Sequence, residues 1–260
     1  MSDGPLKDPK AGSRPRGRGI YLLPNLLTTG ALFAGFYAIV GSIDGNYQRS
    51  AIALLIAQAL DGLDGRVARL TGTESEFGRE YDSLSDLVAF GIAPAIIVYL
   101  WGLVRLAEVG WLAAFLFAVA AALRLARFNV HSPSSDRRFF EGLPSPPAAA
   151  LIWSLVWLGE KLEWSGAGAV ILSCAVTVIA GLLMVSRVPF YSFKDVSPRG
   201  RVSFTRFFVI PLLFVLVALD PPTVLFAMAS TYAASGPVLS LWRLRRRSLR
   251  RQRDGNPRRS

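Results

Sequence analysis

Four aspartates lie close together between residues 61 and 86, and their spacing divides them into two pairs. Asp61 and Asp64 are three residues apart, whereas Asp82 and Asp86 are four residues apart. Residues at these separations share one face of a helix, so each pair would present two carboxylates in the same direction. Because four like charges at one point repel one another, a divalent cation is the natural compensation. Oxygen ligands favour Mg²⁺, Mn²⁺ or Ca²⁺ over zinc.

Small residues are interleaved with these aspartates, at Gly62, Gly65, Ala68 and Gly78. Small side chains let helix backbones approach closely and would also leave a slot for a flat nucleobase and a diphosphate. Arg69 would supply a counter-charge to phosphate. The alternative is that the carboxylates only form ion pairs with neighbouring arginines at a membrane interface. Ionisable groups at membrane depth normally mark a functional site, which favours the first interpretation.

Other kinds of catalytic site are excluded by composition. Cys174 is the only cysteine and His131 the only histidine. A multi-cysteine metal site, a two-histidine zinc site and an intrachain disulfide are therefore ruled out, and a Ser/His/Asp triad is disfavoured. Acid–base chemistry must rest mainly on Asp and Glu.

The elements that position the aspartates are long and apolar. Hydrophobic residues make up 52% of the 260 residues, and they come in blocks instead of alternating with polar ones. Apolar runs of roughly 17 to 25 residues are typical of membrane spans. The sequence therefore predicts an all-α, polytopic transmembrane bundle with about eight spans, near residues 20–43, 50–70, 83–104, 111–128, 145–159, 166–186, 204–219 and 222–242.

The net charge of +11 is unevenly distributed along the chain. Of the 29 Lys and Arg residues, only Arg49, Arg105 and Lys161 fall in the loops after the first, third and fifth spans. Short basic loops stay cytoplasmic, so both termini are expected in the cytoplasm. Because the basic residues sit between apolar blocks and form no basic stripe, we expect no nucleic-acid partner.

Three regions follow from these patterns. Residues 1–19 are polar, basic and rich in Gly and Pro, which predicts a disordered arm. Residues 20–242 form the transmembrane catalytic domain, and residues 243–260 form a second disordered basic tail. The tail either lies against anionic membrane lipids or serves only to fix the topology, and the sequence leaves both interpretations open.

The stretch from Asp61 to Asp86 resembles the D-x2-D-G-x2-A-R-x8-G-x3-D-x3-D signature of the CDP-alcohol phosphatidyltransferases at every position. The resemblance implies a six-span core plus two further spans in a bacterial inner membrane, and the distribution of basic residues places the active site on the cytoplasmic side. The resemblance further implies that all four aspartates hold two divalent cations, Mg²⁺ or Mn²⁺, and that Asp86 is also the general base. The implied contacts to the CDP-lipid are a cytidine pocket and a phosphate site, formed by Gly65, Ala68 and Gly78 and by Arg69 respectively.

Blocks elsewhere in the chain are similar to those of bacterial family members that use L-serine as acceptor. One block carries Asn25 and Thr28, for which a nucleotide contact and span-to-span hydrogen bonding are equally open. The others contain the expected serine-binding residues Arg124, Arg127, Asn129 and Ser145. Serine is a zwitterion, so its carboxylate needs a cation, and two arginines three residues apart can provide one.

The reaction implied by this resemblance is transfer of the phosphatidyl group of CDP-diacylglycerol to the hydroxyl of L-serine, giving phosphatidylserine and CMP. No organic cofactor is expected, and a homodimer is compatible with the sequence. One alternative is a sister enzyme that uses glycerol 3-phosphate or an inositol phosphate. Another is a cation transporter with the four aspartates as its ion site. It is disfavoured because the acids cluster on one side of the membrane, with no acidic relay to the other.

Overall fold

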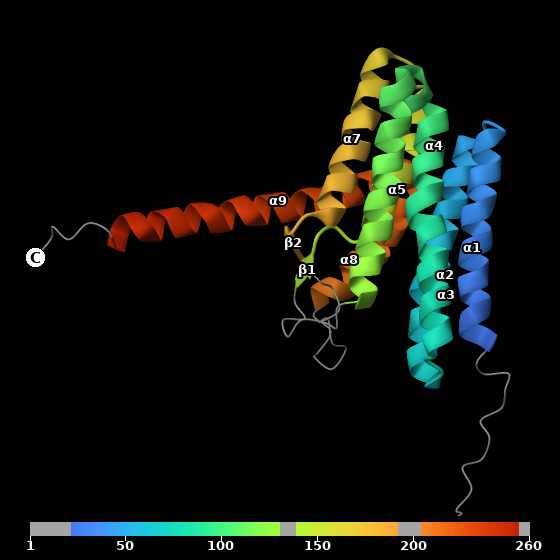
Figure 1. Cartoon of the computed structure of the whole chain (residues 1–260), viewed down its shortest axis with the longest axis horizontal. Coiled ribbons are helices and arrows are strands. Elements are labelled where there is room, and N and C mark those ends of the chain that lie inside the picture. The colour runs from blue at the N-terminus through green and yellow to red at the C-terminus, as the bar shows by residue number, and fades with distance from the viewer. Residues whose placement is uncertain (1–21, 131–138, 192–203, 255–260) are drawn as a thin grey trace, which may run out of the picture.

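The computed structural model describes residues 22–130, 139–191 and 204–254, and nearly all of this chain is helical (Figure 1). The predicted N-terminal arm lies outside the described residues. The elements in chain order are α1 (Leu22–Ile43), α2 (Tyr47–Thr71), α3 (Glu76–Asp86), η1 (Leu87–Ile92), α4 (Ala93–Trp101), η2 (Leu103–Leu106), α5 (Ala107–Val130), β1 (Phe139–Glu141), α6 (Ser145–Lys161), α7 (Ala167–Val185), β2 (Pro189–Tyr191), α8 (Phe204–Leu219) and α9 (Pro221–Asp254).

Four helical stretches in the described chain are long and apolar enough to cross a membrane, namely Leu23–Ile43, Glu76–Trp101, Leu103–Val130 and Ala167–Val185. Helices occupy all eight predicted segments, but the remaining four do not meet this length and hydropathy limit. One reason is that α6 and α8 have only 17 and 16 residues. The architecture is that of an all-α membrane protein, with a small β1–β2 pairing that the sequence did not predict.

The first two helices run side by side at one edge of the bundle (Figure 1). Small residues lie on the facing surfaces, and Ala38, Ala51 and Ala57 have no exposed surface at all. Their small side chains let the two backbones come close. As a result, the N-terminal half of α1 lies beside the C-terminal half of α2, where Asp61 and Asp64 are found.

The turn between α2 and α3 is fixed by a cap at each end. Gly72 ends α2 in the left-handed conformation, with φ 63° and ψ 34°, and its N–H donates to the Ala68 carbonyl. A glycine takes this conformation without steric cost. Ser75 then begins α3, because its hydroxyl accepts a hydrogen bond from the Gly78 N–H at 2.9 Å. Two helices joined this tightly must turn back on each other, which brings the two aspartate pairs together.

The third predicted span, 83–104, begins earlier in the structure. Helix runs from Glu76 through α3, η1 and α4 to Trp101, so both Asp82 and Asp86 lie within it. The middle segment, η1, is a π-helix, with the Ala93 N–H donating to the Val88 carbonyl five residues back. Such wide turns are often found at functional sites. This one directly follows Asp86.

The centre of the bundle is α6, which is buried on all its faces from Leu151 to Gly159. The chain leads into α6 through a turn at Gly142, whose φ is +79°. A Cβ at this position would lie 2.4 Å from the Met184 carbonyl oxygen, so only glycine fits. Gly142 also donates its N–H to the Val188 carbonyl at 2.9 Å, which ties the start of α6 to the segment after α7.

The end of the bundle opposite the aspartates is held by polar contacts between loops. Trp101 Nε1 donates to Glu160 at 2.7 Å, and Arg105 donates to the Ser165 carbonyl at 2.6 Å. Lys161 pairs with Asp220 at 2.5 Å, and its hydrogen bond holds the pKa of Asp220 below its usual range. Two of the three basic residues predicted on this side are therefore engaged in contacts that tie its loops together.

The last helix departs from the sequence-based prediction of a disordered tail from residue 243. In the structure α9 continues to Asp254, and its C-terminal part projects away from the bundle (Figure 1). Arginine and leucine, which dominate residues 243–251, are both good helix formers, and this propensity accounts for the extension.

Candidate active site

The two aspartate pairs meet where α2 and α3 face each other. One carboxylate oxygen from each of Asp61, Asp64 and Asp82 lies within 4.8 Å of the others. Asp86 lies outside this group of three, but its carboxylate lies next to that of Asp61. The tertiary structure thus brings the four predicted aspartates to one place, as a group of three with a fourth attached.

The donor set fits a hard divalent cation. All the ligand atoms on offer are carboxylate oxygens, which suit Mg²⁺, Mn²⁺ or Ca²⁺. In addition, Asp82 Oδ1 is buried and has no hydrogen-bond partner among the described residues. A buried charged oxygen without a partner is costly, and a bound cation would satisfy it. These aspartates can therefore hold a metal ion.

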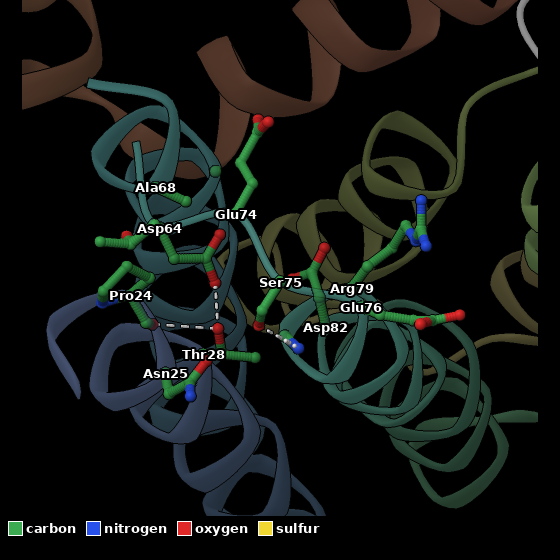
Figure 2. A pocket seen from close by; sticks show the side chains of 13 residues that line it. Pro24, Asn25, Thr28, Asp64, Ala68, Glu74, Ser75, Glu76, Arg79 and Asp82 are labelled. Atoms are coloured by element: carbon green, nitrogen blue, oxygen red, sulfur yellow. Dashed lines mark hydrogen bonds between the residues drawn. The ribbon is translucent and has the colours of Figure 1, made fainter. Parts of the chain in front are cut away.

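Asp64 is the most buried of the four, at 4% exposed. Its Oδ2 accepts a hydrogen bond of 2.7 Å from the Thr28 hydroxyl of α1. Figure 2 shows this bond, with Thr28 pointing from α1 across to the α2 carboxylate. The first helix is therefore part of the carboxylate site, and not only a neighbour of it.

A cavity of about 430 Å³ opens beside the carboxylates, between the start of α1, the end of α2 and the start of α3 (Figure 2). Asp64 and Asp82 stand on its wall. Five of the six predicted CDP-lipid residues also line it, namely Asn25, Thr28, Gly65, Ala68 and Gly78. The cavity joins residues that are more than fifty positions apart in the sequence.

Arg69 is the predicted CDP-lipid residue that does not line this cavity. Its Nε instead donates to the Gly65 carbonyl, one turn back on α2, at 2.8 Å. The arginine on the cavity wall is Arg79 of α3, for which the sequence predicted no binding role. Arg79 lies on the aspartate helix, one turn before Ser83, and this position was the sign in the sequence that its side chain could reach the site.

Of the two effects predicted for the small residues, close helix packing and an open slot, the glycines of α2 show only the second. A Cβ at Gly62 or Gly65 would meet no atom within 4 Å, so these positions leave open space. Gly78 of α3 is the tight one, since a Cβ there would lie 3.0 Å from Ser75 Oγ and 3.4 Å from Asn25 Oδ1. Gly65 therefore leaves open space, as the predicted slot requires, whereas Gly78 allows close packing.

The predicted serine-binding residues divide into two environments. Arg124 of α5 donates through Nη1 to the hydroxyl of Ser145, at 3.3 Å, and Ser145 is 1% exposed. Arg124 Nε is buried without a hydrogen-bond partner in the described chain. The guanidinium also interacts electrostatically with Asp86. Arg124 and Ser145 thus lie together, within electrostatic reach of Asp86.

Arg127 and Asn129 have other partners. Arg127 forms an ion pair with Glu141 of β1. Asn129 donates through Nδ2 to the hydroxyl of Ser83, at 3.0 Å, which ties the end of α5 to the aspartate helix. The sequence predicted Arg124 and Arg127 to act as a pair. Of the two, Arg124 is the one with a buried N–H group that has no hydrogen-bond partner among the described residues.

Tyr232 of α9 is a further residue at this place that the sequence did not indicate. Its hydroxyl donates to the Tyr191 carbonyl at 3.1 Å, and its ring lies 5.8 Å from that of Phe190. It also lies close enough to Arg124 for the two side chains to influence each other's ionisation. Nothing in its local sequence could have revealed this, because the contact depends on how α9 packs against β2 and α6.

Comparisons with known proteins agree with this site. A profile of the family described as CDP-alcohol phosphatidyltransferase matches residues 21–188. The chain is 36% identical to a CDP-diacylglycerol–serine O-phosphatidyltransferase of Helicobacter pylori, over 84% of this chain and 91% of the relative. It is 35% identical to the Mycobacterium leprae protein of that name, over 86% and 77%. An archaetidylserine synthase of Methanothermobacter thermautotrophicus is 39% identical, over 65% and 69%. The chain therefore belongs to the CDP-alcohol phosphatidyltransferase family.

Proposed function

We propose that this protein transfers the phosphatidyl group of CDP-diacylglycerol to L-serine, giving phosphatidylserine and CMP. The observation that carries the proposal is the cluster of aspartates, which borders a cavity and lies within electrostatic reach of a buried arginine. Asp64 and Asp82 line the cavity, and Arg124, which donates to Ser145, is influenced by the charge of Asp86. A transfer reaction needs a donor site and an acceptor site that share one reacting centre. The names of the relatives from Helicobacter and Mycobacterium support the same reaction.

Each group in the site has a part in this reaction. The cavity residues bind and orient the cytidine diphosphate moiety. The four aspartates would hold two divalent cations, Mg²⁺ or Mn²⁺, which when bound neutralise the diphosphate charge. The Asp86 carboxylate accepts the proton of the serine hydroxyl as that oxygen forms a bond to the phosphorus bearing diacylglycerol. The bond from this phosphorus to the CMP oxygen breaks, and CMP leaves with the electron pair.

Arg124 is the residue we assign to the serine carboxylate. It carries the buried, unpartnered donor Nε and it lies beside Ser145 and Asp86. A carboxylate bound there would satisfy that donor and would place the serine hydroxyl toward the proposed base. Glycerol 3-phosphate or an inositol phosphate would bring a dianionic phosphate, which calls for more cations. Since Arg127 is paired with Glu141, this environment favours serine.

We also propose the eight-span arrangement, with both termini and the active site on the cytoplasmic side of a bacterial inner membrane. In support, hydrogen bonds link the three turns that are poor in basic residues, those after α1, α4 and α6, and all three lie at the end of the bundle away from the aspartates. The basic end of α9 would lie along anionic lipid headgroups. A homodimer is compatible with this arrangement.

The orientation can be tested by cysteine labelling in intact cells after Cys174 is replaced by serine. Asp44→Cys and Ser165→Cys should react from outside with a membrane-impermeant maleimide, while Leu70→Cys and Glu80→Cys should react only after permeabilisation. All four positions are exposed. Labelling of Ser165→Cys only after permeabilisation would show that the eight-span arrangement is wrong.

The reaction itself is tested by CMP release from purified protein supplied with CDP-diacylglycerol and one acceptor at a time. Serine should support release, while glycerol 3-phosphate and inositol phosphate should not. A chelator should abolish release, and Mg²⁺ or Mn²⁺ should restore it. Release with glycerol 3-phosphate alone would assign the chain to a sister activity, and cation flux without CMP release would favour the transporter.

A second prediction concerns the base. Asp86→Asn should lower turnover by roughly 10²- to 10⁴-fold, the usual effect of losing a general base. Binding of CDP-diacylglycerol should change much less, because Asp61, Asp64 and Asp82 remain. Turnover is measured by CMP release and binding by competition with a labelled CDP-lipid. If Asp86→Asn abolishes lipid binding as Asp61→Asn does, Asp86 is a ligand and another group is the base.

A third prediction separates the two arginines. Arg124→Ala should raise the serine KM by about 10- to 150-fold, because a charge-assisted hydrogen bond contributes roughly 1.5–3 kcal/mol. Arg127→Ala is the matched control, and loss of its half-exposed ion pair should change the serine KM by no more than about fivefold. The KM for CDP-diacylglycerol should stay unchanged in both variants. An equal rise of the serine KM in both variants would mean that both arginines bind the carboxylate. If the serine KM changes in neither variant, Arg124 is not part of the serine site.

A further inference from the structure

We infer that Thr28 and Ser85 are positioning residues that hold the Asp64 carboxylate in place for the metal ion. This inference rests on the proposed function, since it requires the aspartates to bind cations. Thr28 also lines the cavity, but this role requires neither residue to touch substrate. Their effect would pass through Asp64, by a chain of two hydrogen bonds that crosses three helices.

The first bond joins α1 to α2. The Thr28 hydroxyl has one proton and two acceptors in reach, the Pro24 carbonyl at 3.1 Å and Asp64 Oδ2 at 2.7 Å. The carboxylate is both nearer and charged, so it is the stronger acceptor. Thr28 and Asp64 are each only 4% exposed, and water therefore competes little for this bond. The bond occupies Oδ2 of Asp64 and does not involve Oδ1.

The second bond joins α3 to α1. Ser85 stands between Asp82 and Asp86, is 2% exposed, and donates through its hydroxyl to the Thr28 carbonyl at 3.1 Å. The main chain and the side chain of Thr28 are thereby both fixed, one by the third helix and the other by the second. One turn earlier, the Thr29 and Tyr81 hydroxyls meet at 2.9 Å and strengthen the same α1–α3 contact.

Close backbone packing keeps these bonds in register. A Cβ at Gly35 of α1 would lie 3.1 Å from Ala89 Cα in η1. Gly35 lies two turns after Thr28, and Ala89 lies one turn after Ser85, so the two helices are in contact beyond the hydrogen bond. Outer partners that orient a metal-ligating carboxylate in this way typically change metal affinity 10- to 100-fold when they are lost. Of the two roles open to Thr28 from sequence, we therefore choose the helix-to-helix hydrogen bond.

The experiment is a titration of the purified, substrate-free protein with Mn²⁺, followed by electron paramagnetic resonance of the free ion. Thr28→Val keeps the side-chain shape but removes the hydroxyl, and should weaken Mn²⁺ binding about 10- to 100-fold. Thr28→Ser restores the hydroxyl and should bind within about threefold of the parent, the residual cost of a lost methyl group. Thr177→Val is the matched control, because the buried Thr177 hydroxyl donates to the Ser173 carbonyl of its own helix, α7, at 2.7 Å, and this variant should bind Mn²⁺ as the parent does.

Ser85→Ala gives a second route if Thr28→Val does not fold, as judged by thermal unfolding in detergent. It should weaken Mn²⁺ binding about fivefold, the effect of one neutral hydrogen bond. Ser42→Ala, which removes an equally buried hydroxyl that bonds only within α1, should not. Parental Mn²⁺ affinity in both Thr28→Val and Ser85→Ala, alongside weakened binding in Asp64→Asn, would overturn the inference and leave the proposed function standing. If the parent itself binds no Mn²⁺, both are wrong.

Discussion

Repulsion between carboxylates is the constraint on which the rest of this structure depends. Oxygens of Asp61, Asp64 and Asp82 come within 4.8 Å of one another, and Asp86 contacts Asp61. Like charges this close repel one another, so the arrangement persists only if a cation neutralises the charge and the backbone cannot move the aspartates apart. The caps at Gly72 and Ser75 and the packing of α1 against both neighbours supply that rigidity. A cation would supply the missing charge.

The same constraint explains why α1 matters to a site whose acids come from α2 and α3. The caps at Gly72 and Ser75 turn the chain back on itself, but contacts with a third helix are needed to hold α2 and α3 at a fixed separation. Thr28 is bonded to Asp64 of α2 and to Ser85 of α3, and the cavity lies between these three helices. The first helix thus closes one wall of the cavity and helps to hold the aspartate pairs together.

At the proposed acceptor site, burial separates two residues that look equivalent in the sequence. Arg124 and Arg127 are one turn apart on α5, at the same end of the helix. The turn of the helix nonetheless directs Arg124 inward to Ser145 and the Asp86 side, whereas Arg127 meets Glu141. Only a group with an unsatisfied buried donor gains strongly from binding a carboxylate. The difference comes from β1 and α6, which follow α5 in the chain.

The sequence by itself determined the helical membrane architecture, the positions of eight helical segments, the four aspartates and most of the cavity residues. It could do so because hydropathy and helical spacing are local properties, and the motif is long. Three outcomes were decided by the tertiary structure alone. Arg69 donates to the Gly65 carbonyl, Arg79 lines the cavity, and Tyr232 lies near Arg124. These outcomes depend on contacts between helices far apart in the chain. The physical reason is that side-chain direction at a helix end is set by its packing partners, which no local pattern encodes.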